Sequence, residues 1–465
     1  MPKPPYRYLK SNAIVLDLSD ISLRLQETEE QRQEALDKSR SFQKTLIEAQ
    51  RALEQDPNTG SVWISKLQET LQDAIEVSNK NTTNNIDTTN ADRIPRTAYL
   101  NQRVEDLCRF KALHHFLTTA ELLGPADCVF SDTLKATDEE FLAGALMGLC
   151  QELSRYSLGR ATDRDASSVK QARDVIQKIL DYLLLFDFRN GFLRRKYDGT
   201  KYALKSVETL LYELSVTGAS LESEEPGPAK KPRLDAEETT NDDDLEALRA
   251  RMEHRDSLRE TLIKNCRDGQ KAAKQAIYAL HRKDYAKASK LIGDCETCIL
   301  EKLLPIVREE PPLRYSSFGD VLEEYAEAKL FYAWLLGKNG GDDETMTAAS
   351  ANGTLLLPHD FVKVQLDPEA YLGGLCDLTG EIGRFAVQRG TDRDHDGVHL
   401  CLEANTAILR AIQGLDKTPS KIHKKMDTLR KSVSKIERMI YEMSLSQAAG
   451  MNRNSEVDDA PLLGE

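Results

Sequence analysis

The segment "ELSRYSLGRATDRD" (residues 152–165) recurs later in the chain as "EIGRFAVQRGTDRD" (residues 381–394), so that Glu152 corresponds to Glu381. The same shift along the chain places "VETLLYELSV" (residues 207–216) on "IERMIYEMSL" (residues 436–445). Both matches lie in stretches whose apolar residues recur with a period near 3.6, which is typical of amphipathic helices. Two matches at one shift predict a tandem duplication of a helical unit of roughly 200 residues.

The periodicity extends over most of the 465 residues, and no stretch alternates between apolar and polar residues as a strand would. We therefore expect an all-α fold with two tandem units of about six helices each, at residues 16–217 and 245–446. Residues 218–244 are rich in Pro, Gly, Ser and acidic side chains and are predicted to form a flexible linker. Residues 447–465 are predicted to be a disordered tail.

Composition narrows the class of protein. Charged residues make up 30% of the chain and aromatic residues 6%, which fits a soluble, helix-rich protein. No apolar run approaches the ~20 residues of a membrane span, and the N-terminal segment lacks the apolar core of a secretory signal, so we expect a cytoplasmic protein with no membrane association. The eight cysteines are scattered and are predicted to be reduced thiols. The net charge of −13 argues against nucleic-acid binding over the whole surface, but leaves room for a basic patch or an enclosed site.

Two acidic pairs have helical spacing in the second half. Asp377 and Glu381 lie four residues apart in "YLGGLCDLTGEIGRF" (residues 371–385), and Glu324 and Glu327 lie three apart in "VLEEYAEAKL" (residues 321–330). An acidic pair on each of two helices is the kind of donor set that Mg²⁺ binds.

The residues alone leave a plainer interpretation open. Glu324 and Glu327 belong to an acidic run that is also typical of a solvated helix face. Asp377 stands among apolar residues and needs a partner, which Arg384 or a lysine could provide as a purely structural ion pair.

Longer segments resemble a known family. "GALMGLCQELSRYSLGRATDRD" and "FDFRNGFLRRKYDGTKYALKSVETLLYELSVTG" in the first half resemble translin. "VLEEYAEAKLFYAWL", "YLGGLCDLTGEIGRF" and "KMDTLRKSVSKIERMIYEMSL" in the second half resemble the translin-associated factor X, Trax. The resemblance covers nearly all of both units, and it indicates two ordinarily separate chains fused head to tail. It implies an all-α fold that closes into an octamer-like barrel, binds single-stranded RNA and DNA, and cleaves RNA through the Trax-like half.

The resemblance also implies roles for the acidic pairs. The family's catalytic carboxylates fall on Glu324, Glu327 and Asp377, with Glu381 beside them, as ligands of Mg²⁺ or alternatively Mn²⁺. Such an ion can activate a water molecule and stabilise charge on the leaving oxygen of a phosphodiester. We therefore expect a metal-dependent endoribonuclease. A non-catalytic single-strand-binding scaffold is the main alternative, and a coiled-coil interaction protein built on the first long helix is a weaker one.

The first half departs from the acidic pattern. Aligning the two halves matches Asp106 with Glu324, Arg109 with Glu327, Gly148 with Asp377, and Glu152 with Glu381. Two of the four carboxylates are missing, and Arg109 would repel a divalent cation. We expect this half to be a non-catalytic binding unit.

Binding to phosphates requires cations, and "LRRKYDGTKY" (residues 193–202) interleaves them with Tyr197 and Tyr202. The open alternative is a basic helix start whose tyrosines lie in the core. Arg155 and Arg384 are equivalent across the repeat and could also face the nucleic acid, although structural salt bridges would account for them equally well. The residues expected to bind nucleic acid are Arg194, Arg195, Lys196, Lys201, Arg155 and Arg384.

Two further expectations concern assembly and location. If eight units close the barrel, a homo-oligomer of four fused chains supplies them, and whether separate translin or Trax chains join stays open. The cluster "PAKKPRLD" (residues 228–235) places Lys230, Lys231 and Arg233 between prolines, a setting that suits recognition by import receptors. Such clusters also arise by chance, so the cytoplasm is the expected location and the nucleus is the alternative.

Overall fold

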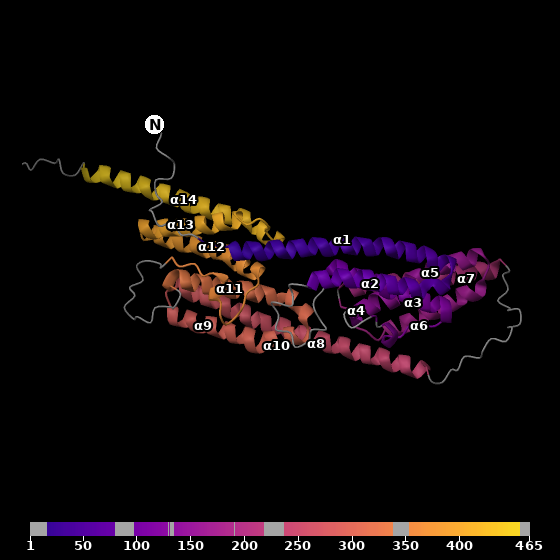
Figure 1. Ribbon diagram of the computed structural model, residues 1–465. Helices are drawn as coiled ribbons and strands as arrows, with labels where there is room; N and C mark the ends of the chain where they lie inside the picture. Colours follow the sequence, from indigo (N-terminus) through magenta and orange to yellow (C-terminus); the bar gives the residue numbers. More distant parts are fainter. Residues whose placement is uncertain are drawn as a thin grey trace, which may run out of the picture. The chain divides into compact units, whose positions relative to one another are not determined.

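The computed structural model describes residues 16–79, 97–128, 130, 134–189, 191–217, 237–337 and 353–455. Packing divides the chain into an N-terminal unit, Glu30–Ser257, and a C-terminal unit that combines Leu258–Glu465 with Met1–Glu29. Over the described ranges the structure contains helices and no strand, which confirms the predicted all-α fold (Figure 1).

The N-terminal unit is built from helices that follow the predicted periodic segments. A π-helical segment, Leu142–Gly148, runs without a break from α4 into α5. Its helices are α1 (Ser19–Gln55, from residue 30), α2 (Gly60–Asn79), α3 (Ala98–Thr119), α4 (Asp138–Phe141), α5 (Leu149–Thr162), α6 (Ala166–Leu183) and α7 (Phe192–Val216).

The C-terminal unit repeats this order of helices. A π-helical segment, Cys298–Leu303, separates its second and third helices. The helices are α8 (Glu237–His281, from residue 258), α9 (Tyr285–Thr297), α10 (Leu304–Glu309), α11 (Ser317–Leu336), α12 (Pro368–Thr391), α13 (His395–Gln413) and α14 (Ser420–Ser455). Helix α14 continues past residue 447, where the tail was predicted to begin, and α8 begins before residue 244, where the linker was predicted to end.

Helices α1 and α8 each contribute residues to both units. The start of α1 packs with the C-terminal unit, whose core includes Leu16, Leu18 and Ile21. The first part of α8 packs with the N-terminal unit, whose core includes Leu245 and Leu248. Apolar side chains at helical spacing explain both contacts, because each stripe must be covered. The packing groups therefore differ from the predicted ranges 16–217 and 245–446, since residues 16–29 pack with the second half and residues 245–257 with the first.

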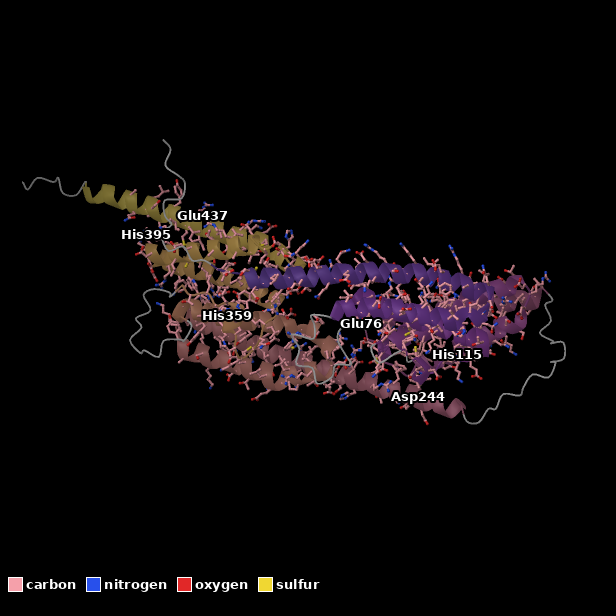
Figure 2. The ribbon with its side chains drawn as sticks, in the orientation of Figure 1. Glu76, His115, Asp244, His359, His395 and Glu437 are labelled. Atoms are coloured by element: carbon pink, nitrogen blue, oxygen red, sulfur yellow. The ribbon has the colours of Figure 1, made fainter. Side chains whose placement is uncertain are left out.

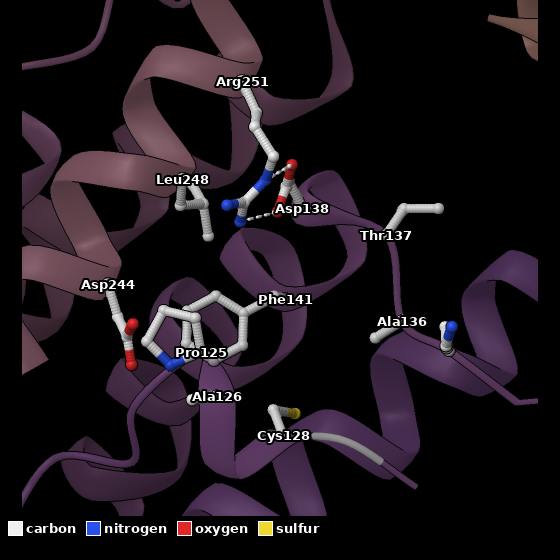
Figure 3. Close-up of a pocket in the computed structure, with 11 residues that line it drawn as sticks. Pro125, Ala126, Cys128, Ala136, Thr137, Asp138, Phe141, Asp244, Leu248 and Arg251 are labelled. Carbon is white, nitrogen blue, oxygen red and sulfur yellow. Dashed lines mark hydrogen bonds and ion pairs between the residues drawn. The ribbon is translucent and has the colours of Figure 1, made fainter. Parts of the chain in front are cut away.

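The contact of α8 with the N-terminal unit also has a polar part. Arg251 donates two hydrogen bonds, of 2.9 and 2.7 Å, to the carboxylate of Asp138 at the start of α4. These side chains line a pocket of about 250 Å³, together with Phe141 and Leu248 (Figure 3). None of the residues expected to be catalytic or to bind nucleic acid lines this pocket.

The internal repeat extends to backbone details. Arg164 and Arg393, which are equivalent across the repeat, both have positive φ angles, 57° and 56°. The aspartates that follow them, Asp165 and Asp394, cap α6 and α13 by accepting hydrogen bonds of 3.0 and 2.9 Å from the backbone amide three residues on. A turn that is unusual for arginine is thus reproduced in both units, as a duplicated fold requires.

Glycines set the close packing that positions the acidic residues. A Cβ at Gly373 of α12 would lie 2.5 Å from Cδ of Glu323 in α11, and a Cβ at the equivalent Gly144 would lie 2.3 Å from the backbone oxygen of Glu105. At Gly144 the close atom is backbone, so a larger residue would force the helices apart, whereas at Gly373 the Glu323 side chain would have to move. Asp377 lies one turn after Gly373, so the close crossing places it against α11.

The outer faces of the helices carry charged side chains, as Figure 2 shows for Glu76 of α2 and Glu437 of α14. All eight cysteines are free thiols, as predicted, and all of them are buried. Among the helices that the structure describes, none is long and apolar enough to cross a membrane.

Candidate active site

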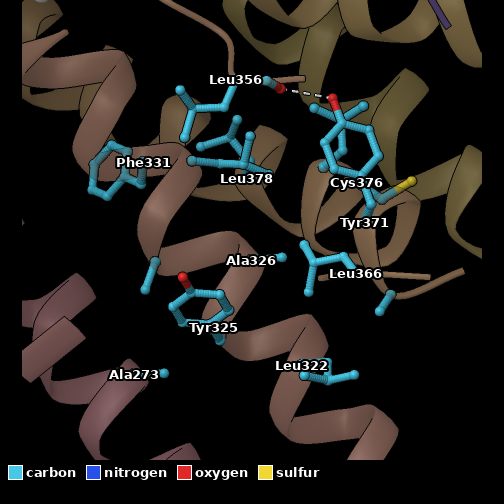
Figure 4. Close-up of a cluster of buried hydrophobic side chains, with 14 of the residues drawn as sticks. Ala273, Leu322, Tyr325, Ala326, Phe331, Leu356, Leu366, Tyr371, Cys376 and Leu378 are labelled. Atoms are coloured by element: carbon cyan, nitrogen blue, oxygen red, sulfur yellow. Dashed lines mark hydrogen bonds between the residues drawn. The ribbon is translucent and has the colours of Figure 1, made fainter. Parts of the chain in front are cut away.

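Helices α11 and α12 supply the four carboxylates that the sequence singled out. The two helices pack through a core that includes Tyr325 and Tyr371, and the hydroxyl of Tyr371 donates a 2.8 Å hydrogen bond to the carbonyl of Leu356 (Figure 4). Large side chains on one face of each helix thus fix the distance and rotation of the pair. The acidic residues occupy neighbouring positions on the same two helices.

The four carboxylates interact with one another. Glu327 is 9% exposed, whereas Glu324, Asp377 and Glu381 are half-buried. Burial, together with the charges of Asp377, Glu381 and Glu324, raises the pKa of Glu327 to about 8. Like charges oppose ionisation of a carboxyl group, and this effect weakens with distance. The predicted residues therefore form one acidic cluster.

Two members of the acidic cluster contact basic side chains of α8. The ammonium of Lys274 lies 3.0 Å from Oε1 of Glu324. Nε2 of His281 is hydrogen-bonded to Oε2 of Glu381, and the imidazole ring packs against Phe331 with a centroid distance of 4.9 Å. The sequence analysis did not identify Lys274 or His281, because neither belongs to a motif and each is distant in sequence from its partner.

Asp377 lies among apolar residues, and either Arg384 or a lysine was expected to be its partner. The structure shows a lysine. Lys425 of α14 donates a 2.5 Å hydrogen bond to Oδ2 of Asp377 and a second hydrogen bond to Oε1 of Glu323. Glu323 is buried and also pairs with Lys421 at 2.6 Å. Burial raises the pKa of Asp377, and the hydrogen bond from Lys425 opposes that rise.

The donor chemistry of the acidic cluster fits Mg²⁺, which prefers carboxylate oxygens. The side chains do not converge, however: within the described residues, no three His, Cys, Asp or Glu side chains are arranged around one point as metal ligands. The assignment of Glu324, Glu327, Asp377 and Glu381 as ligands and catalytic residues therefore stays a prediction.

The equivalent place in the N-terminal unit contains an arginine. The guanidinium of Arg109 donates a 3.1 Å hydrogen bond to Asp106 and lies 3.4 Å from Oε1 of Glu152. Both carboxylates are buried, and Asp106 also accepts from Arg103 at 2.8 Å. A Cβ at Gly148 would lie 3.1 Å from Cδ of Arg109, so glycine leaves room for the arginine side chain where the other unit has Asp377.

One ion pair is common to both units. Lys196 contacts buried Glu105, and Lys425, its equivalent in the repeat, contacts Glu323 at the matching position. In each unit the pair joins the last helix to the helix that carries the first acidic residue. Lys196 was predicted to bind nucleic acid, and the structure places its ammonium in this internal contact.

The other basic residues of "LRRKYDGTKY" lie on the surface of α7. Arg195 is exposed, and Arg194 and Lys201 are each about half exposed near the ring of Tyr197. Tyr197 is buried, whereas Tyr202 is 74% exposed. Tyr197 therefore lies in the core, which was the structural alternative, and Tyr202 lies on the surface, where a binding role requires it.

Arg155 and Arg384 both form the ion pair that their helical spacing allows. Arg155 contacts Glu152, and Arg384 lies 3.9 Å from Oε2 of Glu381. Both side chains stay mostly exposed, at 66% and 60%. Arg155 also borders an open groove between α5 and α7, of about 580 Å³, which Tyr202 lines from the other side. The predicted import cluster Lys230, Lys231 and Arg233 lies outside the described residues.

A family model matches both halves of the chain, and curated relatives match part of it. The model of the Translin family matches residues 25–218 and 257–447. The Translin-associated protein X homolog of Schizosaccharomyces pombe is 29% identical over 224 residues, which cover 43% of this chain and 87% of that protein. Human Translin is 36% identical over 85 residues, which cover 18% of this chain and 37% of Translin.

Solved structures are also similar to the chain, at lower sequence identity. A crystal structure of AfC3PO has a TM-score of 0.37 and 20% identity, and covers 44% of this chain and 98% of that one. A structure of an AfC3PO–duplex RNA complex has a TM-score of 0.35 and 19% identity, and covers 44% of this chain and 98% of that one.

Proposed function

Because the chain belongs to the Translin family, with both helical units matched, we propose that it is a Mg²⁺-dependent endoribonuclease acting on single-stranded RNA. The C-terminal, Trax-like unit carries the chemistry in this proposal, and the N-terminal, translin-like unit contributes single-stranded RNA and DNA binding. A Translin-associated protein X homolog, matched over 87% of its own length, supports the presence of a Trax-like unit in this chain.

The observation that carries the proposal is the difference in charge between the two equivalent places. The acidic cluster of the C-terminal unit has four carboxylates, and the pKa of Glu327 is raised first by burial and then by the charges of the other three. At the position of Glu327 the N-terminal unit has Arg109, whose guanidinium lies between the two remaining carboxylates. The N-terminal unit thus has an arginine beside its two remaining carboxylates, whereas the C-terminal unit has four carboxylates with Lys274 and Lys425 beside them, a larger set of oxygen donors that supports binding of an added cation.

In this proposal the protein provides ligands and orientation. Glu324, Glu327, Asp377 and Glu381 would hold the ion through carboxylate oxygens, and Mg²⁺ would supply an activated water and charge stabilisation at the phosphate. Arg384 is exposed beside Glu381 and would contact a neighbouring phosphate of the RNA. Side chains of α7 would bind a single strand, Tyr202 by stacking on bases and the cations by phosphate contacts. The cations are Arg194, Arg195 and Lys201.

The decisive test is cleavage of a labelled single-stranded RNA by the full chain. We expect cleavage with Mg²⁺ or Mn²⁺ and none with a chelator. Cleavage that continues undiminished in the chelator would refute the role of the metal. RNA binding measured in parallel, by fluorescence anisotropy, separates a loss of chemistry from a loss of substrate binding.

Assembly into a closed barrel of four chains is part of the proposal. Three pairs of equivalent positions expose apolar side chains in both units, and a repeated exposed apolar face indicates an interface. Further copies of this chain are the expected occupants, and mass measurement in solution should give four chains, whereas a stable monomer would contradict the barrel. The pairs are Leu158 and Val387, Tyr212 and Tyr441, and Val216 and Leu445.

A non-catalytic scaffold that binds single-stranded nucleic acid is the second candidate. The observation in its favour is that Glu324 and Asp377 each contact a lysine and Glu381 is hydrogen-bonded to His281, as structural carboxylates are. The scaffold predicts RNA binding without cleavage under every metal condition, so the cleavage assay also decides between the two candidates.

A further inference from the structure

We propose that the groove between α5 and α7 is a binding site for one unpaired nucleotide, whose base stacks on Tyr202 while its phosphates contact Arg155 and Lys205. The inference rests on the proposed function, because it names the place at which the N-terminal unit distinguishes a single strand from a duplex. It also gives a role to Gln151 and Lys205, which belong to no motif of the sequence.

The walls of the groove carry an aromatic ring, two cations and a neutral amide. Tyr202, which is 74% exposed, and Lys205 line it from α7, and Gln151 and Arg155 line it from α5. Its volume of about 580 Å³ lies within the range of roughly 300–1,000 Å³ that is usual for ligand sites. These groups match a nucleotide, because a ring stacks on a base, an amide can hydrogen-bond to a base edge, and a cation contacts a phosphate.

The ring and the amide share one end of the groove. A Cβ at Gly199 would lie 3.2 Å from Nε2 of Gln151, so the amide packs over this glycine of α7. Tyr202 follows Gly199 by about one helical turn. A base stacked on the ring therefore has a hydrogen-bonding side chain beside its edge.

Two cations flank the same end. Arg155 lies about one turn after Gln151 on α5, and its guanidinium contacts buried Glu152 but stays 66% exposed. A guanidinium has five N–H donors, so one contact with a carboxylate leaves others for a phosphate. Lys205 lies about one turn after Tyr202 and is exposed.

The other end of the groove has a different chemistry. Leu158 lies about two turns beyond Gln151 on α5, and Glu213 lies about three turns beyond Tyr202 on α7. Leu158 belongs to the apolar residues expected between copies of the chain, and the carboxylate of Glu213 would repel a phosphate. Nucleotide binding and assembly therefore use different ends of the groove.

The equivalent place in the C-terminal unit lacks the groups that bind a base. The repeat equivalents of Tyr202 and Gln151 are Lys431 and Gly380, so these two positions supply neither a ring nor an amide. Arg384 preserves the arginine of the first helix. Phosphate contacts are thus available in both units, whereas base stacking belongs to the groove of the N-terminal unit.

Stacking on Tyr202 requires a base that is not already paired and stacked. Extruding a base from a duplex costs a few kcal/mol, whereas the phosphates of a duplex remain accessible to cations. The ring therefore strengthens binding of single strands, and the cations strengthen binding of both forms. The ratio of the two affinities separates the two contributions.

The experiment measures binding of a labelled single-stranded RNA, and of a duplex of the same sequence, to the full chain by fluorescence anisotropy in a chelator. We expect Tyr202→Ala to raise the dissociation constant for the single strand about 5- to 150-fold, the cost of losing one base–aromatic stack, and to leave that for the duplex nearly unchanged. Tyr202→Phe keeps the ring and should restore most of the affinity. Lys431→Ala is the matched control at the repeat-equivalent position, and it should change both affinities by the same factor.

A strand without bases isolates the stacking contribution. An abasic sugar–phosphate oligonucleotide keeps the charges, so the wild type and Tyr202→Ala should bind it equally. No loss of single-strand affinity in Tyr202→Ala, or an equal loss for the ordinary strand, the abasic strand and the duplex, would overturn the inference.

Mass measurement of the same variant in solution tests the alternative occupant, a second copy of the chain. If Tyr202→Ala altered the assembly and left single-strand affinity unchanged, the groove would be an interface between copies and the inference would be wrong. Because the side chain is exposed, urea unfolding of this variant should match the wild type. A wild-type chain that binds no single strand would refute the proposed function itself, which is a different failure.

Discussion

The same crossing of two helices carries different charged side chains in the two units. In the N-terminal unit Arg109 lies between Asp106 and Glu152, and Gly148 leaves space for it. In the C-terminal unit the position of Arg109 belongs to Glu327, a buried carboxyl whose pKa is raised to about 8. The backbone turns, the close glycine contact and one lysine–glutamate pair are common to both.

The comparison teaches that the fold is largely independent of the charges at this crossing. Large apolar side chains and glycines set the helix packing in both units, so three of the four equivalent side chains could change without altering it. The N-terminal unit has an arginine between two carboxylates at these positions, and the C-terminal unit has four carboxylates that Lys274 and Lys425 contact from other helices. The following predictions test this difference between the two units.

The largest expected effect is on RNA cleavage. Asp377→Asn should lower the rate by about 10²- to 10³-fold or more, because it weakens stabilisation of charge in the transition state. Single-turnover cleavage measures the rate, and RNA binding should stay near the wild-type value. Asp106→Asn, in the first unit, is the matched control and should leave the rate nearly unchanged. Equal losses in both variants would show that the units share one active site.

A second prediction concerns the arginine that neutralises the N-terminal unit. Arg109→Gln should lower stability by about 1–3 kcal/mol, because buried Asp106 and Glu152 lose a charged partner while Arg103 and Arg155 remain. Urea unfolding measures the change. Arg438→Gln removes a pair in which both side chains are mostly exposed, and it serves as the control with little expected effect. Equal stability of both variants would mean that Arg109 is not needed to neutralise the site.

A third prediction separates surface cations from the internal lysine of α7. Replacing Arg194, Arg195 and Lys201 with glutamine should weaken RNA binding about tenfold and flatten its salt dependence, since each lost phosphate contact removes roughly 0.7 from the slope. Lys196→Gln should instead lower stability, because Glu105 is buried. Anisotropy at several salt concentrations and urea unfolding provide the two measurements. If Lys196→Gln alone flattened the salt slope at unchanged stability, its contact with Glu105 would not be its main role.

The smallest expected effect is a dependence of stability on pH. The pKa of Glu327 is about 8 in the folded chain and near its ordinary value of 4.5 when unfolded. Between these values the folded chain binds more protons than the unfolded chain, so this group lowers stability as pH rises. In a chelator, the melting temperature of the wild type should fall more from about pH 5 to pH 8 than that of Glu327→Gln. Parallel curves for the two proteins would contradict the raised pKa.

Much of this molecule could be predicted from the sequence because the relevant signals are local or repeated. Helical periodicity depends on neighbouring residues, and the constant shift between matching segments relates the two halves without any knowledge of their packing. The four acidic positions follow from helical spacing together with the family resemblance. The loss of two of them in the first half follows from the alignment of the repeat.

Only the tertiary structure decided which side chains meet. Lys274 and His281 reach the carboxylates from α8, and Lys425 reaches them from α14, because helices distant in sequence pack on α11 and α12. The assignment of Lys196 to Glu105, and the burial of one tyrosine of α7 but not the other, depend in the same way on which face of a helix is covered. A sequence pattern specifies a helix and its stripe, whereas the partner of each charge depends on contacts between stripes far apart in the chain.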